Sequence, residues 1–94
     1  MTGLKWVVIV QPPAGCGDAF DIPERSYESA CGTRDRYRAR GWKALVAPAN
    51  VRKIPWFVRG SGVDEIQVDA RSADEAIMIA RAKNQSYDEV QRVW

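Results

Sequence analysis

The segment Leu4–Val10 constrains the fold more than any other part of the chain. It is a run rich in β-branched and aromatic residues, which favours a strand. Successive strand residues point to opposite faces, and here both alternating sets are apolar except for Lys5. The segment therefore predicts a strand buried on both faces, in the middle of a sheet. Because 94 residues build one hydrophobic core, residues 1–94 are expected to form a single domain.

The next part of the sequence predicts a loop, a helix and a second strand. Gln11–Pro23 contains three prolines and two glycines, a composition typical of a long ordered loop, and such loops often carry function. Glu24–Arg40 predicts a helix that ends at Gly41, a residue suited to a left-handed C-cap. Trp42–Ala47 predicts a strand directly afterwards. The strand–helix–strand order favours a parallel crossover.

The middle of the chain predicts a hairpin. Val51–Arg59 has the composition of an extended segment, but Pro55 has no N–H to donate to a ladder, so the strand is expected either to lie at an edge or to begin late. A Gly-Ser-Gly turn then leads into Val63–Ala70. Apolar and polar residues alternate along its second half, which predicts a strand with one buried and one solvated face.

The last quarter of the chain predicts two helices. Ser72 and Glu75 have the spacing of a capping box, which indicates the start of a helix. Ser86 and Glu89 repeat this spacing, so a short C-terminal helix is expected over Tyr87–Trp94. The predicted order is β-α-β-β-β-α with this short C-terminal helix. It favours an α+β fold, a two-layer sandwich with its helices on one face of a mixed sheet. No internal repeat is evident.

Composition excludes several classes of chemistry. The chain has no histidine, which removes the commonest general base, the Ser-His and Cys-His nucleophile pairs, and zinc sites that need imidazole. Gly15 and Gly17 follow a predicted strand, but the third glycine of a dinucleotide-binding turn is absent. We therefore expect a protein that is not an enzyme, with no catalytic residue, no metal site and no cofactor.

The apolar segments of the sequence are short. None approaches the ~20 apolar residues that span a membrane, so no membrane partner is expected. The run before Gln11 is also too short for the core of a signal peptide. A cytoplasmic location is therefore predicted, with Cys16 and Cys31 as reduced thiols.

The first functional hypothesis is a protein-interaction module. Large apolar and aromatic residues fall in the edge-like segment, on a second side of the helix after Ser72, and in the C-terminal helix. Aromatic residues and Met are enriched in protein interfaces. The size would fit a phage or mobile-element accessory protein that binds a host protein, and a homodimer is a further form of this interaction. The predicted partner-binding residues are Ile54, Trp56, Phe57, Met78, Ile79, Tyr87, Val90 and Trp94.

The alternative hypothesis is a nucleic-acid-binding protein. The net charge of +2 is low for a DNA binder, but arginines are concentrated in the stretch 34–40. On a helix, these arginines divide between two nearly opposite sides, which dilutes the positive charge. Nearby aromatic side chains could stack on the bases of a single strand. The predicted nucleic-acid-binding residues are Arg34, Arg36, Arg38, Arg40, Tyr37 and Trp42.

Overall fold

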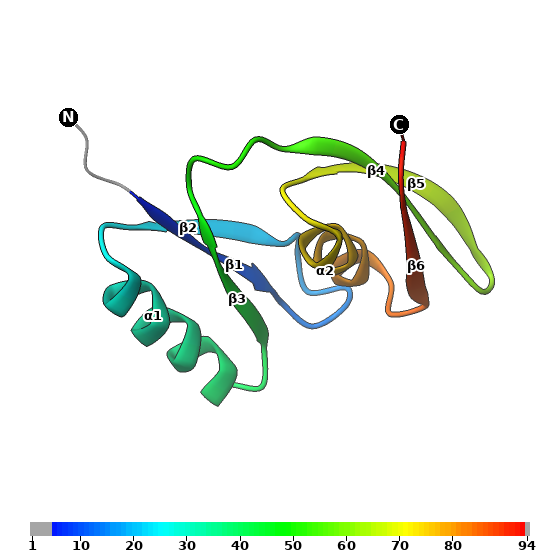
Figure 1. Cartoon of the computed structure of the whole chain (residues 1–94). Coiled ribbons are helices and arrows are strands. Elements are labelled where there is room, and N and C mark those ends of the chain that lie inside the picture. Colours follow the sequence, from blue (N-terminus) through cyan, green and yellow to red (C-terminus); the bar gives the residue numbers. More distant parts are fainter. Residues whose placement is uncertain (1–4, 94) are drawn as a thin grey trace.

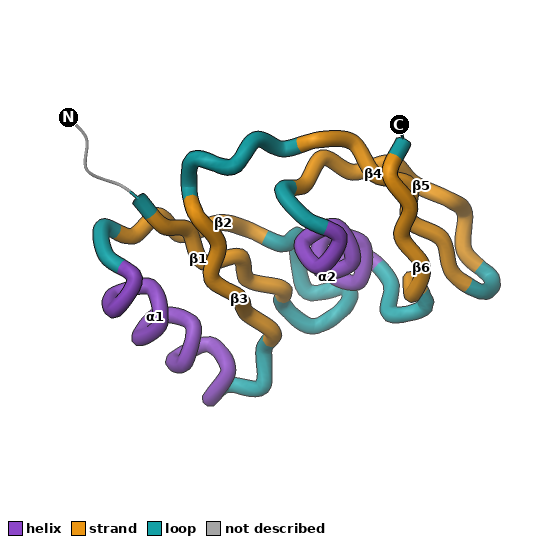
Figure 2. The backbone as a smooth tube through the Cα atoms, in the orientation of Figure 1, coloured by secondary structure: helices purple, strands orange, loops and turns teal. Residues whose placement is uncertain are grey.

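Six strands and two helices make up residues 5–93, the part of the chain that the computed structural model describes (Figures 1 and 2). The fold is α+β, as the sequence predicts. Neither of these helices is long and apolar enough to cross a membrane. In chain order the elements are β1 (Trp6–Gln11), β2 (Phe20–Glu24), α1 (Tyr27–Ala39), β3 (Lys43–Pro48), β4 (Ile54–Gly60), β5 (Val63–Ala70), α2 (Ala73–Lys83) and β6 (Tyr87–Arg92).

The strands form two antiparallel sheets, so the expectation of one mixed sheet is wrong. Sheet A has the order β2-β1-β3, and sheet B has the order β5-β4-β6. Strand β1 lies at the centre of sheet A, and its residues 7–11 are all buried. This confirms the prediction of a central strand that is buried on both faces.

The two sheets are built by the same unit, a hairpin followed by a helix and a third strand. β1-β2-α1-β3 forms sheet A, and β4-β5-α2-β6 forms sheet B. In each unit the third strand pairs with the first, on the side opposite the second. The residues paired across the middle of the two sheets also correspond. In sheet A, Val8 lies between Ile22 and Val46, and in sheet B, Val58 lies between Ile66 and Val90. The structure therefore contains a ββαβ repeat, which corrects the expectation that the chain has none.

Helix α2 lies between the two sheets, which makes four layers rather than two (Figure 1). Its Ala76 and Ala80 pack in the core with sheet B. Its Met78 packs in the opposite direction, against Val7 and Ile9 of β1. Helix α1 covers the other face of sheet A, where Ala30 is fully buried. The layer order is therefore α1, sheet A, α2 and sheet B.

Strand β2 covers the end of the segment expected to be a loop and Glu24, which was expected to begin the helix, and it changes the connectivity. Phe20–Glu24 pairs antiparallel with β1, so the chain has already reversed before α1 begins. β3 is therefore antiparallel to β1, and the parallel crossover joins β2 to β3. The alternation of Phe20, Ile22 and Glu24 was obscured by Pro23, which sits on an edge strand where a missing N–H is tolerated.

The expected C-terminal helix is strand β6. Tyr87 and Val90 have helical spacing, but sheet B offers β4 an unpaired side, and β6 fills it from Tyr87 to Arg92. The Ser86 N–H donates to the Asn84 side chain, so the supposed capping box is a turn. Trp94 lies outside the described residues.

The proline-containing strand β4 is central, not at an edge. The Val93 N–H donates to the Pro55 carbonyl, so the ring nitrogen of Pro55 also faces the β6 side. The β4–β6 register begins at Trp56 opposite Arg92, one residue after Pro55. The N–H that Pro55 lacks therefore falls just outside the regular β4–β6 pairing, where a central strand tolerates proline.

The first turn of α1 carries a pH-dependent contact. The Ser29 and Thr33 hydroxyls donate to the Glu24 carboxylate and, with Ser29 the larger effect, lower its pKa from 4.5. Stability from a carboxyl with a lowered folded pKa is present above the ordinary value and is lost as the pH falls through the folded value. The wild type should therefore melt higher than Glu24→Gln near neutral pH, and the gap should close well below pH 4.5. Melting curves recorded across this pH range test the prediction. A difference in melting temperature that does not depend on pH would contradict it.

Candidate functional site

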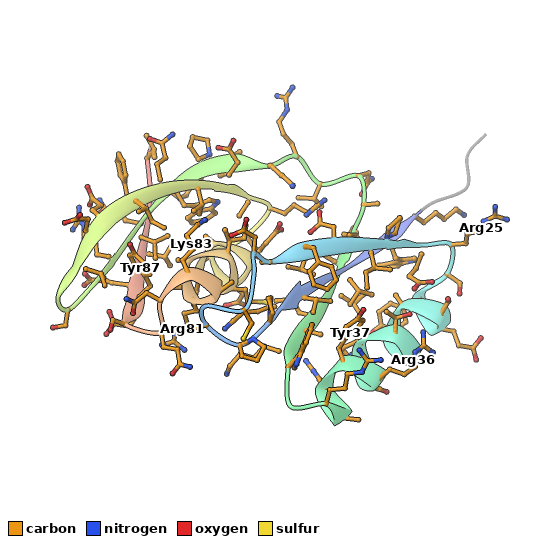
Figure 3. The ribbon with its side chains drawn as sticks, turned by 180° about the vertical axis from the view of Figure 1, so that it is seen from behind. Arg25, Arg36, Tyr37, Arg81, Lys83 and Tyr87 are labelled. Carbon is orange, nitrogen blue, oxygen red and sulfur yellow. The ribbon has the colours of Figure 1, made fainter. Side chains whose placement is uncertain are left out.

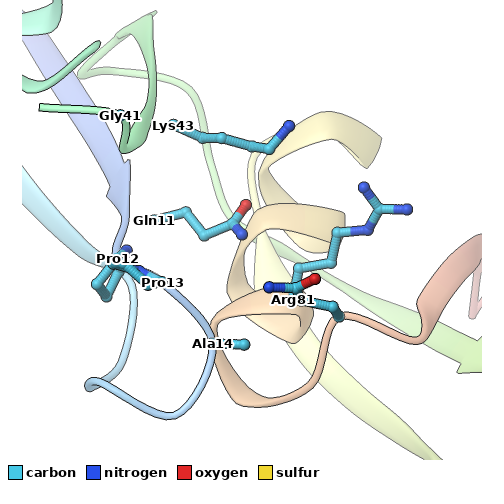
Figure 4. A pocket seen from close by; sticks show the side chains of 8 residues that line it. Gln11, Pro12, Pro13, Ala14, Gly41, Lys43 and Arg81 are labelled. Atoms are coloured by element: carbon cyan, nitrogen blue, oxygen red, sulfur yellow. The ribbon is translucent and has the colours of Figure 1, made fainter. Parts of the chain in front are cut away.

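A pocket of about 430 Å³ opens where the two ββαβ units meet (Figure 4). We call it the joint pocket. The loop after β1, the α1–β3 turn and the C-terminal end of α2 contribute to it. Its lining residues are Gln11, Pro12, Pro13, Ala14, Gly41, Lys43, Arg81 and Gln85.

Backbone interactions fix the three walls of the joint pocket. Gln11 at the end of β1 pairs directly with Lys43 at the start of β3. Gly41, at φ 84°, adopts the left-handed conformation that turns the chain from α1 into β3, as the sequence predicts. The Gly15 N–H donates to the Ala82 carbonyl at 3.1 Å, which fastens the loop to the end of α2. The pocket is therefore built on ordered elements.

The joint pocket is positively charged. Lys43 and Arg81 project toward the same opening from different units (Figure 4), and none of the described residues that line it is acidic. Lys43 is exposed and has no salt bridge within residues 5–93. The Arg81 Nε donates to the Tyr87 carbonyl at 2.6 Å, which orients the guanidinium. The site is suited to a negatively charged group.

Gln11 gives the pocket a polar group without a protein partner. The side chain is only 7% exposed, and its Oε1 has no hydrogen-bond partner among the described residues. Leaving a buried acceptor unpaired costs about 1–3 kcal/mol. Native proteins seldom retain such a group without a reason, and a bound water or ion is one of these. Figure 4 shows the carboxamide directed into the pocket.

A second hollow, of about 450 Å³, shares Gly41 and Lys43 with the joint pocket. We call it the Trp42 hollow, and its lining contains no acidic residue among those described. It also holds Arg38, whose Nε donates to the Ala44 carbonyl at 3.0 Å. In both units, then, an arginine near the end of the helix bonds to the carbonyl six residues later, in the next strand. The remaining residues of the Trp42 hollow are Ala44, Leu45 and Met78.

The structure does not keep the predicted nucleic-acid-binding residues together. Arg34 is paired with Asp35, the Arg36 Nη2 donates to Thr33, and the Arg40 guanidinium lies 5.2 Å from the centre of the Tyr37 ring. Arg36 on α1 lies well apart from Arg81 on α2 (Figure 3). Of the six residues, Arg38 and Trp42 reach the Trp42 hollow.

The predicted partner-binding residues divide into buried and peripheral groups. Met78 and Tyr87 are 7% and 5% exposed, so the expectation that they lie on an open surface is wrong. Trp56 faces the core, where its Nε1 donates to the Ala70 carbonyl at 3.0 Å. Partly buried positions are Ile54, Phe57, Ile79 and Val90. A protein partner and a homodimer stay predictions, and Phe57 on the outer face of sheet B is the side chain best placed for them.

Sequence reasoning missed Gln11, Lys43 and Arg81 as a group, because they come together only where the two ββαβ units meet. A signal was nevertheless present. Arg25-Ser26 and Arg71-Ser72 precede the two helices, and aligning the units on them would have placed Arg38 and Arg81 at nearly corresponding helix ends.

Comparisons with known proteins give no relative from which a chemistry for the site could be taken. A scan of protein-family models and searches of curated proteins and of solved structures found no match to this chain. Residues 5–93 contain no group of three or more His, Cys, Asp or Glu that could hold a metal ion. Cys16 and Cys31 are free thiols, and neither lines the joint pocket.

Proposed function

We propose that this protein is a binding module for an anionic ligand, which it holds in the joint pocket. The observation that carries the proposal is the convergence of Lys43 and Arg81, one from each ββαβ unit, with no carboxylate among the described lining residues.

The two cations have complementary roles. Arg81 is held by its bond to the Tyr87 carbonyl, so it presents its terminal nitrogens in a fixed direction. An ordered guanidinium suits a forked contact with two oxygens of a phosphate or carboxylate. Lys43 is a mobile point charge at the rim, which attracts the anion and adjusts to its position. We propose binding rather than catalysis because the chain lacks histidine and none of the described residues that line the pocket is a Ser, Thr or Cys.

Pyrophosphate is a suitable probe, and Lys43→Gln is the variant that tests the site. Lys43 is exposed, so the substitution should leave the fold intact. We expect it to weaken pyrophosphate binding about fivefold, which corresponds to one partly solvated charge-assisted contact. Isothermal titration calorimetry at one fixed ionic strength measures the effect, since salt screens exposed charges.

Arg52→Gln is the matched control. It removes the same charge from an exposed residue that lines neither the joint pocket nor the Trp42 hollow. We expect it to change the affinity by less than about twofold, because a distant exposed charge is screened. If both variants weakened binding equally, the attraction would come from the net charge, and the proposal of a defined site would be wrong.

A further inference from the structure

We infer that the free edge of strand β3 docks an extended, acidic segment of a partner protein, which adds a further strand to sheet A. This inference goes beyond the proposed function, because it concerns the strand edge rather than the joint pocket. β3 is an edge strand, since sheet A has the order β2-β1-β3 (Figure 1). An edge strand with unpaired backbone groups is a template for another strand.

The β1–β3 register shows which backbone groups of β3 point away from β1. The Ala49 N–H donates to the Lys5 carbonyl at 2.9 Å, so the adjacent pair of Trp6 and Pro48 is one whose two residues do not bond to each other. Alternation along the antiparallel ladder then directs the N–H and C=O of Val46 toward the free edge. Neither group has a partner from a turn or loop in the part of the chain that the structure describes. Val46 therefore presents one donor and one acceptor to an incoming strand.

The sequence of β3 leaves this edge unprotected. Native edge strands are commonly guarded by charged side chains, by proline or by bulges. Of the four edge strands, β2 contains Pro23 and two carboxylates, and β5 and β6 each carry several charged side chains. β3 has Lys43 at its first position, proline only at its last, and no charge between them. Its register with β1 is regular, so β3 is the edge best suited to further pairing.

Side chains of an added strand find space on both faces of sheet A. Trp42 and Ala44 pack on the face covered by α1, while Leu45 and Met78 pack on the face covered by α2. The Trp42 hollow is lined by all four, so it extends around the edge of β3. Successive side chains of an extended segment point to opposite faces and meet apolar atoms on each. Strand addition takes affinity from the backbone bonds and selectivity from such hollows.

The charges beside β3 favour an acidic partner. Arg38 and Lys43 line the Trp42 hollow at one end of the edge, and Lys5 lines a hollow of about 490 Å³ with Pro48 at the other. None of these cations forms a salt bridge within residues 5–93, and no acidic residue is among the described ones that line either hollow. Antiparallel pairing with a second copy would place the Lys43 end of each β3 against the Lys5 end of the other. Like charges across strands are unfavourable, so a segment with carboxylates fits better.

Arg38 covers part of the edge in the free protein. Its Nε donates to the Ala44 carbonyl, which by the same alternation points away from β1, and Ala44 is only 4% exposed. An incoming backbone N–H can replace Arg38 at this carbonyl. The released guanidinium then pairs with a carboxylate of the docked segment.

The test uses two variants of Val46. Val46→Pro removes the outward N–H, a change that an edge strand tolerates, while Val46→Ala shortens the side chain and keeps the N–H. The probe is an acetylated and amidated Glu-Val-Thr-Val-Thr-Glu peptide, titrated by ¹⁵N NMR. We expect Val46→Ala to bind it within about twofold of the wild type and Val46→Pro to bind it at least about fivefold more weakly.

Two altered peptides test the same claim on the unaltered protein. The first has lysine in place of both glutamates, and the second is N-methylated at its four central residues. Each should bind the wild type at least about fivefold more weakly than the acidic peptide, because one loses the charge match and the other loses the backbone donors. These measurements keep the inference testable if Val46→Pro fails to fold.

The outcomes separate the two proposals. If the lysine peptide or the N-methylated peptide binds as tightly as the acidic peptide, the inference is wrong. Self-association that Val46→Pro abolishes, without binding of the acidic peptide, would show that a second copy occupies the edge and would also overturn it. If pyrophosphate binds and the acidic peptide does not, the anion site stands and the inference fails. Binding of the peptide without pyrophosphate would give the reverse result.

Discussion

Replacing Glu75 by glutamine should lower the free energy of unfolding by about 3–5 kcal/mol, the usual cost of removing one member of a buried ion pair. Glu75 is 1% exposed and lies in the first turn of α2. Its carboxylate accepts from the Arg71 Nη1 at 2.9 Å and from the Arg71 backbone N–H at 3.1 Å. The neutral amide would leave the Arg71 guanidinium, whose side chain is only 11% exposed, without its main counter-charge.

A second ion pair of Arg71, with Asp21, joins the two ββαβ units. The Arg71 Nη2 donates to Asp21 of β2 at 3.1 Å, so a side chain that precedes α2 reaches into sheet A. The loss should therefore appear as one cooperative transition at lower denaturant concentration, followed by circular dichroism. A shift in the midpoint at constant slope would show that stability changed and compactness did not.

The double variant Arg71→Met with Glu75→Gln is the control for this prediction. It removes the guanidinium that has lost its main counter-charge, including an Nε without a partner among the described residues, and the introduced amide oxygen can still accept from the backbone N–H of residue 71. More than half of the lost stability should return, because the penalty comes mainly from an uncompensated charge. A double variant as unstable as Glu75→Gln would show that the charge is not the source of the penalty.

Gly60→Ala should lower the free energy of unfolding by about 3 kcal/mol, at the upper end for added volume in a packed site. A Cβ at this position would lie 2.0 Å from the Ser86 carbonyl oxygen and 2.6 Å from its carbon. Both atoms belong to the backbone that leads into β6, so the strand itself would have to move. Chemical denaturation measures the loss.

Gly32→Ala is the matched comparison for Gly60→Ala. Gly32 lies inside α1, and a Cβ there would meet nothing within 4 Å. Alanine is the better helix former by about 0.5–1 kcal/mol, so this variant should be more stable than the wild type. The same substitution should thus lower the free energy of unfolding at Gly60 and raise it at Gly32. A destabilised Gly32→Ala, or a Gly60→Ala variant as stable as the wild type, would contradict the packing described for these two positions.

Sequence reasoning was strongest where the pattern is local. The burial of β1, the hairpin strand Val63–Ala70, the Gly41 cap and the Ser72 start of α2 all follow from short-range chemistry, and the structure confirms each. These features depend on alternation, on a left-handed residue and on a side chain that caps an N–H, all of which can be recognised within a few residues.

Sequence reasoning failed where the structure of a segment depends on the strand or sheet beside it. Tyr87–Arg92 is a strand because β4 has a free side at that place, and no property of the segment itself requires it. β2 was hidden in a proline-rich segment for the same reason, since β1 supplies its partner. Met78 points away from the main apolar stripe of α2 because a second sheet covers that side, which a two-layer expectation could not accommodate.

The candidate site was the least predictable feature. Gln11 is unremarkable in a strand-end position, and Lys43 and Arg81 are separated by most of the second unit. They meet because the α1–β3 turn and the end of α2 converge on the loop after β1, which was expected to carry function but without a named site. The Arg34–Arg40 stretch drew attention because its charges are adjacent in sequence, yet local partners engage most of them.

An NMR titration of the ¹⁵N-labelled protein with pyrophosphate tests the proposed anion site most directly. We expect saturable shifts of backbone amides around the joint pocket, strongest near Gly41, Lys43, Arg81 and Gln85, together with a change at the Arg81 Nε–H. Shifts that do not saturate, or that are as large at the exposed Arg52 and Arg92 as at the pocket, would contradict it.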